Sequence, residues 1–118
     1  MAEHIHTGKL GEQIAKDHLK LQGHIILSTN YRYKRSEIDI ISRSEDTLIF
    51  TEVKTRKNKK YGNPEDFIDE LKVEKIEEAA ENYILENHWE GKIRFDIISI
   101  ILERGSVIET IHIEDALF

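Results

Sequence analysis

The sequence predicts an α/β or α+β sandwich in which helices flank a mixed central β-sheet, in the order α-β-β-β-α-β-β. Two segments carry apolar residues at helical spacing, and five shorter segments are rich in β-branched and aromatic residues. One helix therefore precedes three strands, and a second helix precedes the last two strands.

The first helix is expected over residues 8–22, with Gly23 as its stop and with an apolar face formed by Leu10, Ile14, Ala15 and Leu19. Three strands follow at residues 24–33, 36–44 and 47–55. The polar pair Glu45-Asp46 predicts a turn between the second and third strands, which makes them an antiparallel hairpin.

The second helix is expected to start near Asn63 and Pro64 and to run to about His88. Asn63 suits the cap, Pro64 suits the first helical position, and the acids that follow suit the positive end of the helix dipole. Strands are expected at residues 92–102 and 106–113 around a turn at Arg104-Gly105. The sequence shows no repeat or linker, so one domain over residues 1–118 is expected.

Composition excludes several classes of protein. The chain is 39% hydrophobic and 34% charged, which is typical of a globular protein and too apolar for a disordered one. It has no cysteine, so disulfides and thiolate metal sites are excluded. No apolar run is long enough to span a membrane, and residues 1–12 lack the apolar segment of a signal peptide. A cytoplasmic protein without a membrane partner is expected.

The charges are distributed unevenly. The net charge of −6 alone argues against a nucleic-acid partner. However, residues 28–60 contain nine Lys/Arg against five Asp/Glu, whereas residues 61–118 contain five against fifteen. Such polarity can focus a local field even in an acidic protein, although both blocks could equally be solvated surface.

Three charged residues interrupt the apolar hairpin strands. A symmetric turn at Glu45-Asp46 would place Asp39 directly opposite Glu52, with their side chains on one face. Two carboxylates so close repel unless a cation lies between them, and Mg²⁺ or Mn²⁺ prefers such oxygen ligands. Lys54 lies two residues beyond Glu52 on the same face, where it could act on a water, and the carbonyl of Val53 is a further candidate ligand.

Two interpretations of these charges are open. Opposed acids and a Glu-x-Lys pair also occur on exposed strands without a function. Against this, Ile41, Leu48 and Phe50 continue the same face as an apolar stripe. Glu12 and Lys72 also lie on apolar helix faces, and buried charges are rare unless they are paired or functional. Together these residues indicate a converging site.

Several motifs carry a resemblance to a known family. Asp39, Glu52 and Lys54 form a D-x₁₂-E-x-K arrangement that resembles the PD-(D/E)XK nuclease superfamily. The segments GKLGEQIAKDHLKLQGHIILSTNYR, EIDII, TEVKTR, K-x-x-K-I-x-x-x-A and RFDII resemble more closely the YraN-like family of uncharacterised bacterial proteins. The match covers residues 8–98. One departure is Ser36, which stands where that family usually has glycine.

The resemblance implies a restriction-endonuclease-like fold, similar to that of archaeal Holliday junction resolvases. It implies a divalent-metal-dependent endonuclease that hydrolyses DNA, with Mg²⁺ or Mn²⁺ as cofactor and Asp39, Glu52 and Glu12 as ligands. Lys54 would assist the attacking water. An alternative is a non-catalytic nucleic-acid-binding or repair-scaffold protein with the same fold. Related nucleases dimerise, so a homodimer is left open. The candidate nucleic-acid ligands are Arg32, Arg56, Lys57, Lys59, Lys60 and Lys72.

Overall fold

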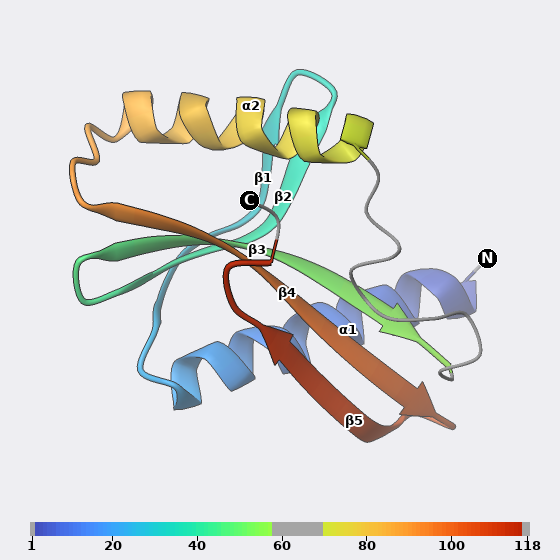
Figure 1. The fold of residues 1–118 in the computed structure, drawn as a ribbon. Helices are drawn as coiled ribbons and strands as arrows, with labels where there is room; N and C mark the ends of the chain where they lie inside the picture. Colours follow the sequence, from blue (N-terminus) through green and yellow to red (C-terminus); the bar gives the residue numbers. More distant parts are fainter. Residues whose placement is uncertain (1, 58–69, 117–118) are drawn as a thin grey trace.

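The computed structural model describes residues 2–57 and 70–116, with side chains from Gly8 and from Leu71 onward in the two parts. The observed order is α-β-β-β-α-β-β, as the sequence predicts (Figure 1). The elements are α1 (Ala2–Leu21), β1 (Ile25–Tyr33), β2 (Ser36–Ser44), β3 (Thr47–Arg56), α2 (Glu70–Glu86), β4 (Lys92–Glu103) and β5 (Ser106–Ile113). Within the described residues, no helix is long and apolar enough to cross a membrane.

Most element boundaries agree with the prediction, and α1 is the main correction. It begins at Ala2 rather than at residue 8, because no breaker precedes Gly8 and an isolated glycine is tolerated within a helix. It ends as expected near Gly23, which has a φ of 90° and donates its N–H to the Lys20 carbonyl at 3.0 Å. The predicted start of α2 at Asn63 lies outside the described residues.

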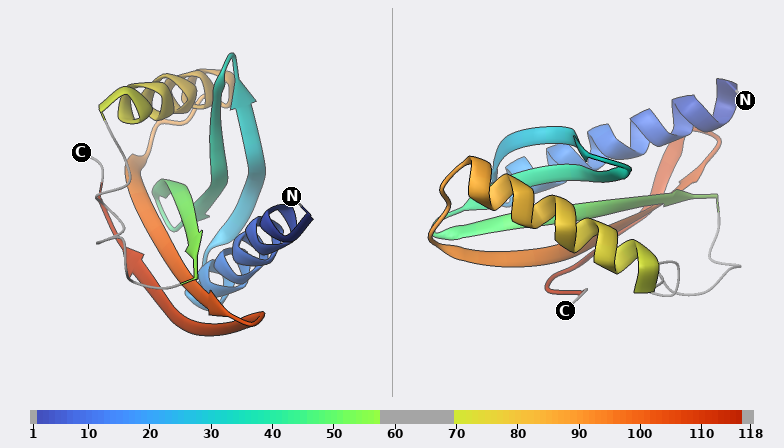
Figure 2. Two further views of the ribbon diagram at one scale, coloured as in Figure 1. Left: turned by 90° about the vertical axis from the view of Figure 1, so that its right-hand side faces the viewer. Right: turned by 90° about the horizontal axis from the view of Figure 1, so that it is seen from above.

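The five strands form one mixed sheet in the order β1-β2-β3-β4-β5. Neighbouring strands are antiparallel except β3 and β4, which are parallel. Parallel neighbours need a crossover, and α2 provides it between these two strands. The two helices lie on opposite faces of the sheet, as the two views in Figure 2 show.

Each helix packs on its own core. On the α2 face, Ile76, Ala79 and Ala80 contact an apolar cluster that includes Leu48, and Phe50 stacks on Phe95 with ring centroids 5.2 Å apart. On the α1 face, the buried side chains are Ala15, Leu19, Ile40, Ile98, Ile100 and Leu102. Both faces of the central strands are therefore covered, which explains why β4 reads as an almost continuous apolar run.

The β1–β2 hairpin bends away from the sheet at Asn30 and Asp39. Asn30 adopts a φ of 53°, in the left-handed region that asparagine tolerates better than most residues. The β2–β3 ladder ends at the pair Ile40 and Thr51, so the hairpin continues without β3 and rises toward α2 (Figure 1). There, Tyr31 packs edge-on against Tyr83 of α2, with ring centroids 5.2 Å apart. The bend leaves Asp39 at the corner between hairpin, sheet and helices.

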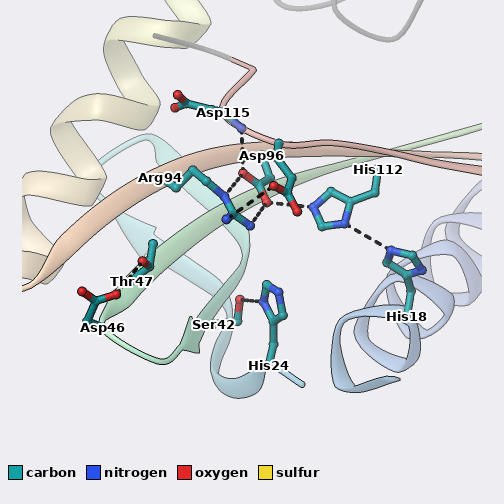
Figure 3. A network of polar contacts seen from close by, with 10 residues as sticks. His18, His24, Ser42, Asp46, Thr47, Arg94, Asp96, His112 and Asp115 are labelled. Carbon is teal, nitrogen blue, oxygen red and sulfur yellow. Dashed lines mark hydrogen bonds and ion pairs between the residues drawn. The ribbon is translucent and has the colours of Figure 1, made fainter. Parts of the chain in front are cut away.

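A buried polar network joins β4, β5 and α1 (Figure 3). The carboxylate of Asp96 is fully buried and accepts two hydrogen bonds of 2.9 Å from Arg94 and one of 3.0 Å from the Asp115 N–H. It also lies 2.7 Å from His112 Nε2, and His112 Nδ1 lies 3.1 Å from His18 Nε2. The network attaches the last strand and the end of α1 to the centre of the sheet.

Asp96→Ala is expected to lower the free energy of unfolding by about 3–5 kcal/mol, because it leaves the Arg94 guanidinium without its buried partner. Burial would raise the pKa of Asp96, but the hydrogen bonds from His112, Arg94 and the Asp115 N–H outweigh it and leave the pKa lowered. The stabilisation by this carboxylate is therefore present at neutral pH and is lost as the pH falls below about 4. Urea unfolding at pH 7 would measure the change, with Asp46→Asn as an exposed control. A loss below about 1 kcal/mol would show that the network adds little.

Candidate metal centre and cleft

Asp39 lies at the bend of β2 and is partly buried. Its Oδ2 accepts a hydrogen bond of 2.8 Å from the backbone N–H of Val53. Burial and the nearby charge of Glu52 raise the pKa of Asp39 to about 7, against the opposing effect of the Val53 N–H. The surroundings therefore stabilise the ionised form of Asp39 too little, and a bound cation would stabilise it.

Three carboxylates converge at this corner. Glu12 from α1 and Glu37 and Asp39 from β2 each offer an oxygen, and these oxygens all lie within 4.8 Å of one another. Glu37 and Asp39 are two residues apart, so the alternation of the strand directs them to one side. Within residues 8–57 and 71–116, no other group of three acidic or histidine side chains meets so closely.

Two neighbours position Glu12. Gly11 lets α1 approach β3 closely, since a Cβ at this position would lie 1.9 Å from Thr55 Oγ1. The side-chain amide of Asn30 is oriented so that its nitrogen donates hydrogen bonds to both acids, at 2.8 Å to Glu12 Oε1 and at 2.9 Å to Glu37 Oε1. The three carboxylates therefore form a hard-oxygen donor set, which fits Mg²⁺ or Mn²⁺.

Glu52 and two lysines lie on the α2 side of the cluster. Glu52 is buried, with its Oε1 2.7 Å from Lys72 Nζ. Burial would lower the pKa of Lys72, but the hydrogen bond and charge of Glu52 outweigh it and raise the pKa. Burial and the neighbouring Lys72 lower the pKa of Lys54. Lys54 is thus the lysine of this pair that gives up its proton more readily.

A cleft of about 490 Å³ opens onto the acids. Glu37, Asp39 and Glu52 line it between two walls. Arg35 and Ser36 at the hairpin tip belong to one wall, and the start of α2 forms the other with Leu71, Lys72, Lys75 and Ile76. Acidic groups and cations therefore lie within the same recess.

The predicted hairpin register is confirmed over five pairs, from Ser44–Thr47 to Ile40–Thr51. The predicted pairing of Asp39 with Glu52 is wrong, because the ladder ends one pair earlier and Asp39 instead accepts from the Val53 N–H. The acidic group includes the predicted Glu12 and Asp39 and adds Glu37, but not Glu52. A metal contact by Glu52 or by the Val53 carbonyl stays a prediction.

The predicted nucleic-acid residues are dispersed. Arg32 is exposed and pairs with Glu37 across the β1–β2 ladder, and Arg56 ends β3. Lys57 is exposed directly after β3, Lys72 is held by Glu52, and Lys59 and Lys60 lie outside the described residues. Trp89 packs against the core on the α2 face, and its Nε1 donates to the Lys92 carbonyl at 2.9 Å.

Sequence reasoning missed four residues of the site. Glu37 could have been found, since its spacing of two from Asp39 places both side chains on one face of a strand. Asn30 gave no signal, because its role depends on a left-handed backbone within a strand. Arg35 and Lys75 could not be placed, because the cleft arises from the bend that brings the hairpin tip beside α2.

The fold and the cluster define an α/β protein of two helices and a five-stranded mixed sheet, with a candidate site for a hard divalent cation. The chain belongs to UPF0102, an uncharacterised protein family whose model matches residues 11–100. This membership confirms the resemblance to the YraN-like family.

Individual relatives support the membership over the full length. The chain is 44% identical over 119 residues to a UPF0102 protein of Christiangramia forsetii, covering all of this chain and 98% of the relative. It is 46% identical over 102 residues to one of Dictyoglomus thermophilum, covering 86% of each chain. A relative from Bacteroides thetaiotaomicron is 36% identical over 118 residues, with 100% and 97% covered. The names of these relatives state the family and give no activity.

Proposed function

We propose that this protein is a divalent-metal-dependent nuclease of the PD-(D/E)XK type, which hydrolyses phosphodiester bonds in nucleic acid and most readily in DNA. The observation that carries the proposal is the meeting of the carboxylates of Glu12, Glu37 and Asp39, with Glu52 and Lys54 on the neighbouring strand β3. Lys54 is close enough to Asp39 and Glu52 for the charges of both carboxylates to act on its pKa.

The residues have distinct roles in this proposal. Glu12, Glu37 and Asp39 hold Mg²⁺ or Mn²⁺, and Glu52 adds negative charge at the same place. The bound ion would supply an activated water and stabilise the charge that develops on the phosphate. Lys54 in its neutral form accepts a proton from the attacking water. Lys72 stays protonated and donates to the Glu52 carboxylate, and burial together with Lys72 lowers the pKa of Lys54.

Phosphate groups of the substrate would contact the basic residues around the acids. Arg56 is the last residue of β3, the strand that carries Glu52 and Lys54, and Lys57 follows it. We assign these two residues to phosphates that flank the cleaved bond. Phosphate contacts position the strand without reading its sequence.

A cleavage assay with purified protein tests the function. The substrates are single-stranded, duplex and branched forms of one DNA sequence and of the matching RNA, each with Mg²⁺, Mn²⁺ or a chelator. We expect cleavage of at least one DNA form that requires the metal and is lost in Asp39→Asn. The scaffold alternative is favoured if the wild type binds these substrates and cleaves none. Equal cleavage by the wild type and Asp39→Asn would contradict the assigned site.

A further inference from the structure

Two cations in the cleft have no role in the nuclease proposal. Arg35 at the hairpin tip and Lys75 on α2 line opposite walls, and both side chains are exposed. In the part of the chain that the structure describes, no ion pair is seen for either of them. Their neighbours differ, since Lys34 lies 3.4 Å from Glu78 and Lys72 lies 2.7 Å from Glu52. Arg35 and Lys75 are therefore the cleft cations best able to take an incoming anion.

The α2 wall of the same cleft also presents apolar surface. Leu71 is 61% exposed and lies beside the buried Ile76 in the lining. An exposed apolar side chain in a cleft that also carries two cations suits a ligand that alternates phosphates with flat apolar groups. An unpaired nucleic-acid strand has this pattern, because its bases offer free faces between successive phosphates.

The size of the recess points in the same direction. A volume of about 490 Å³ is that of a small-ligand pocket, with room for a short length of one strand. The faces of bases inside a duplex are covered by stacking, so Leu71 could not reach them. A duplex would offer the cleft its phosphates and leave the apolar wall unused.

We propose that this cleft binds an unpaired strand, with one phosphate between Arg35 and Lys75 and an adjacent base or sugar against Leu71. The inference rests on the proposed function for its chemistry, since the phosphate to be cleaved would be held at the cation that the carboxylates bind. The binding itself needs no turnover. It therefore assigns single strands, or the unpaired arms of branched molecules, as the substrate class.

Fluorescence anisotropy tests this in Ca²⁺, a hard cation used here to replace Mg²⁺ in a binding measurement. The probes are a labelled DNA single strand and the blunt duplex of the same sequence. We expect the wild type to bind the single strand at least tenfold more tightly than the duplex. Arg35→Ala combined with Lys75→Ala should weaken single-strand binding at least tenfold. It should also reduce the slope of log affinity against log salt by about 0.7, the value for one lost phosphate contact on a single strand.

The matched control removes two exposed lysines elsewhere, Lys20 in the last turn of α1 and Lys92 at the start of β4. This pair should change the affinity less than twofold, which separates the cleft from net charge. Leu71→Asn should weaken the single strand while leaving the salt slope unchanged, because it removes no charge. Thermal melting of each variant verifies that it folds.

The outcomes separate this inference from the nuclease proposal. Equal affinity for single strand and duplex, or unchanged binding by the Arg35/Lys75 variant, overturns the inference even if the wild type cleaves DNA. Tight single-strand binding that depends on Arg35 and Lys75, with no cleavage under any metal, upholds the inference and rejects the nuclease. Binding of free nucleotides as tight as that of the strand would also overturn it.

Discussion

Lys54→Ala is expected to reduce the cleavage rate by about 10²–10⁴-fold, the usual contribution of a positioned general base. The physical reason is the lowered pKa of Lys54, which burial and Lys72 produce and which makes the neutral amine accessible. Binding of nucleic acid should change little, because Lys54 is partly buried and the phosphate contacts are assigned to other residues. Single-turnover cleavage and anisotropy on the same substrate measure the two effects separately.

A matched control is Lys57→Ala, which removes an exposed lysine three residues further along the chain. It should lower the affinity modestly and leave the single-turnover rate at saturating substrate intact. The pH profile at saturating metal adds a readout that a structural role would not move: the rise of the wild-type rate with pH, as Lys54 loses its proton, should be absent from Lys54→Ala. A variant that cleaves at a near wild-type rate would show that Lys54 is only a structural charge.

Asp39→Asn is expected to have opposite effects on stability with and without metal. The folded protein raises the pKa of Asp39 from 3.8 to about 7, so the native state binds this proton more tightly than the unfolded state. The metal-free wild type should therefore lose stability as the pH rises from about 4 to about 7, on the order of a few kcal/mol. Asparagine cannot ionise, so the variant should escape this loss.

Addition of Mn²⁺ should reverse the ranking. Metal binds the native state and stabilises it by mass action, and the effect depends on intact carboxylates. At pH 8 the wild type should gain thermal stability with Mn²⁺, whereas Asp39→Asn should gain little. Asp46→Asn, an exposed acid at the β2–β3 turn, is the control and should behave as the wild type does. A wild type whose metal-free stability is independent of pH between about 4 and 7 would contradict the raised pKa of Asp39.

The sequence was a good guide to the strands and a weaker one to the site. Strands β2 and β5 have the predicted bounds, Ser36–Ser44 and Ser106–Ile113, because turn residues and β-branched runs fix both ends. The register also followed from the symmetric turn at Glu45-Asp46. Local signals of this kind depend on neighbours in the chain and can be read directly.

The bend at Asn30 and Asp39 could not be read in this way. Regular alternation predicts that Asp39 faces Glu52, but packing of the hairpin tip against α2 ends the ladder one pair earlier. As a result, the acidic group contains Glu37 where the sequence analysis predicted Glu52. The buried Asp96 network was missed for the same reason, since His18, His112 and Asp96 meet only through the sheet order.

The measurement that tests the central claim most directly is calorimetric titration of Mn²⁺ into the metal-free wild type, Glu37→Gln and Asp39→Asn. The account predicts one site in the wild type, weakened at least tenfold in Asp39→Asn and also weakened in Glu37→Gln, because each loses an oxygen ligand of the group that Glu12 completes. Equal Mn²⁺ affinity in the wild type and Asp39→Asn would contradict it, and the acidic corner would then be no metal centre.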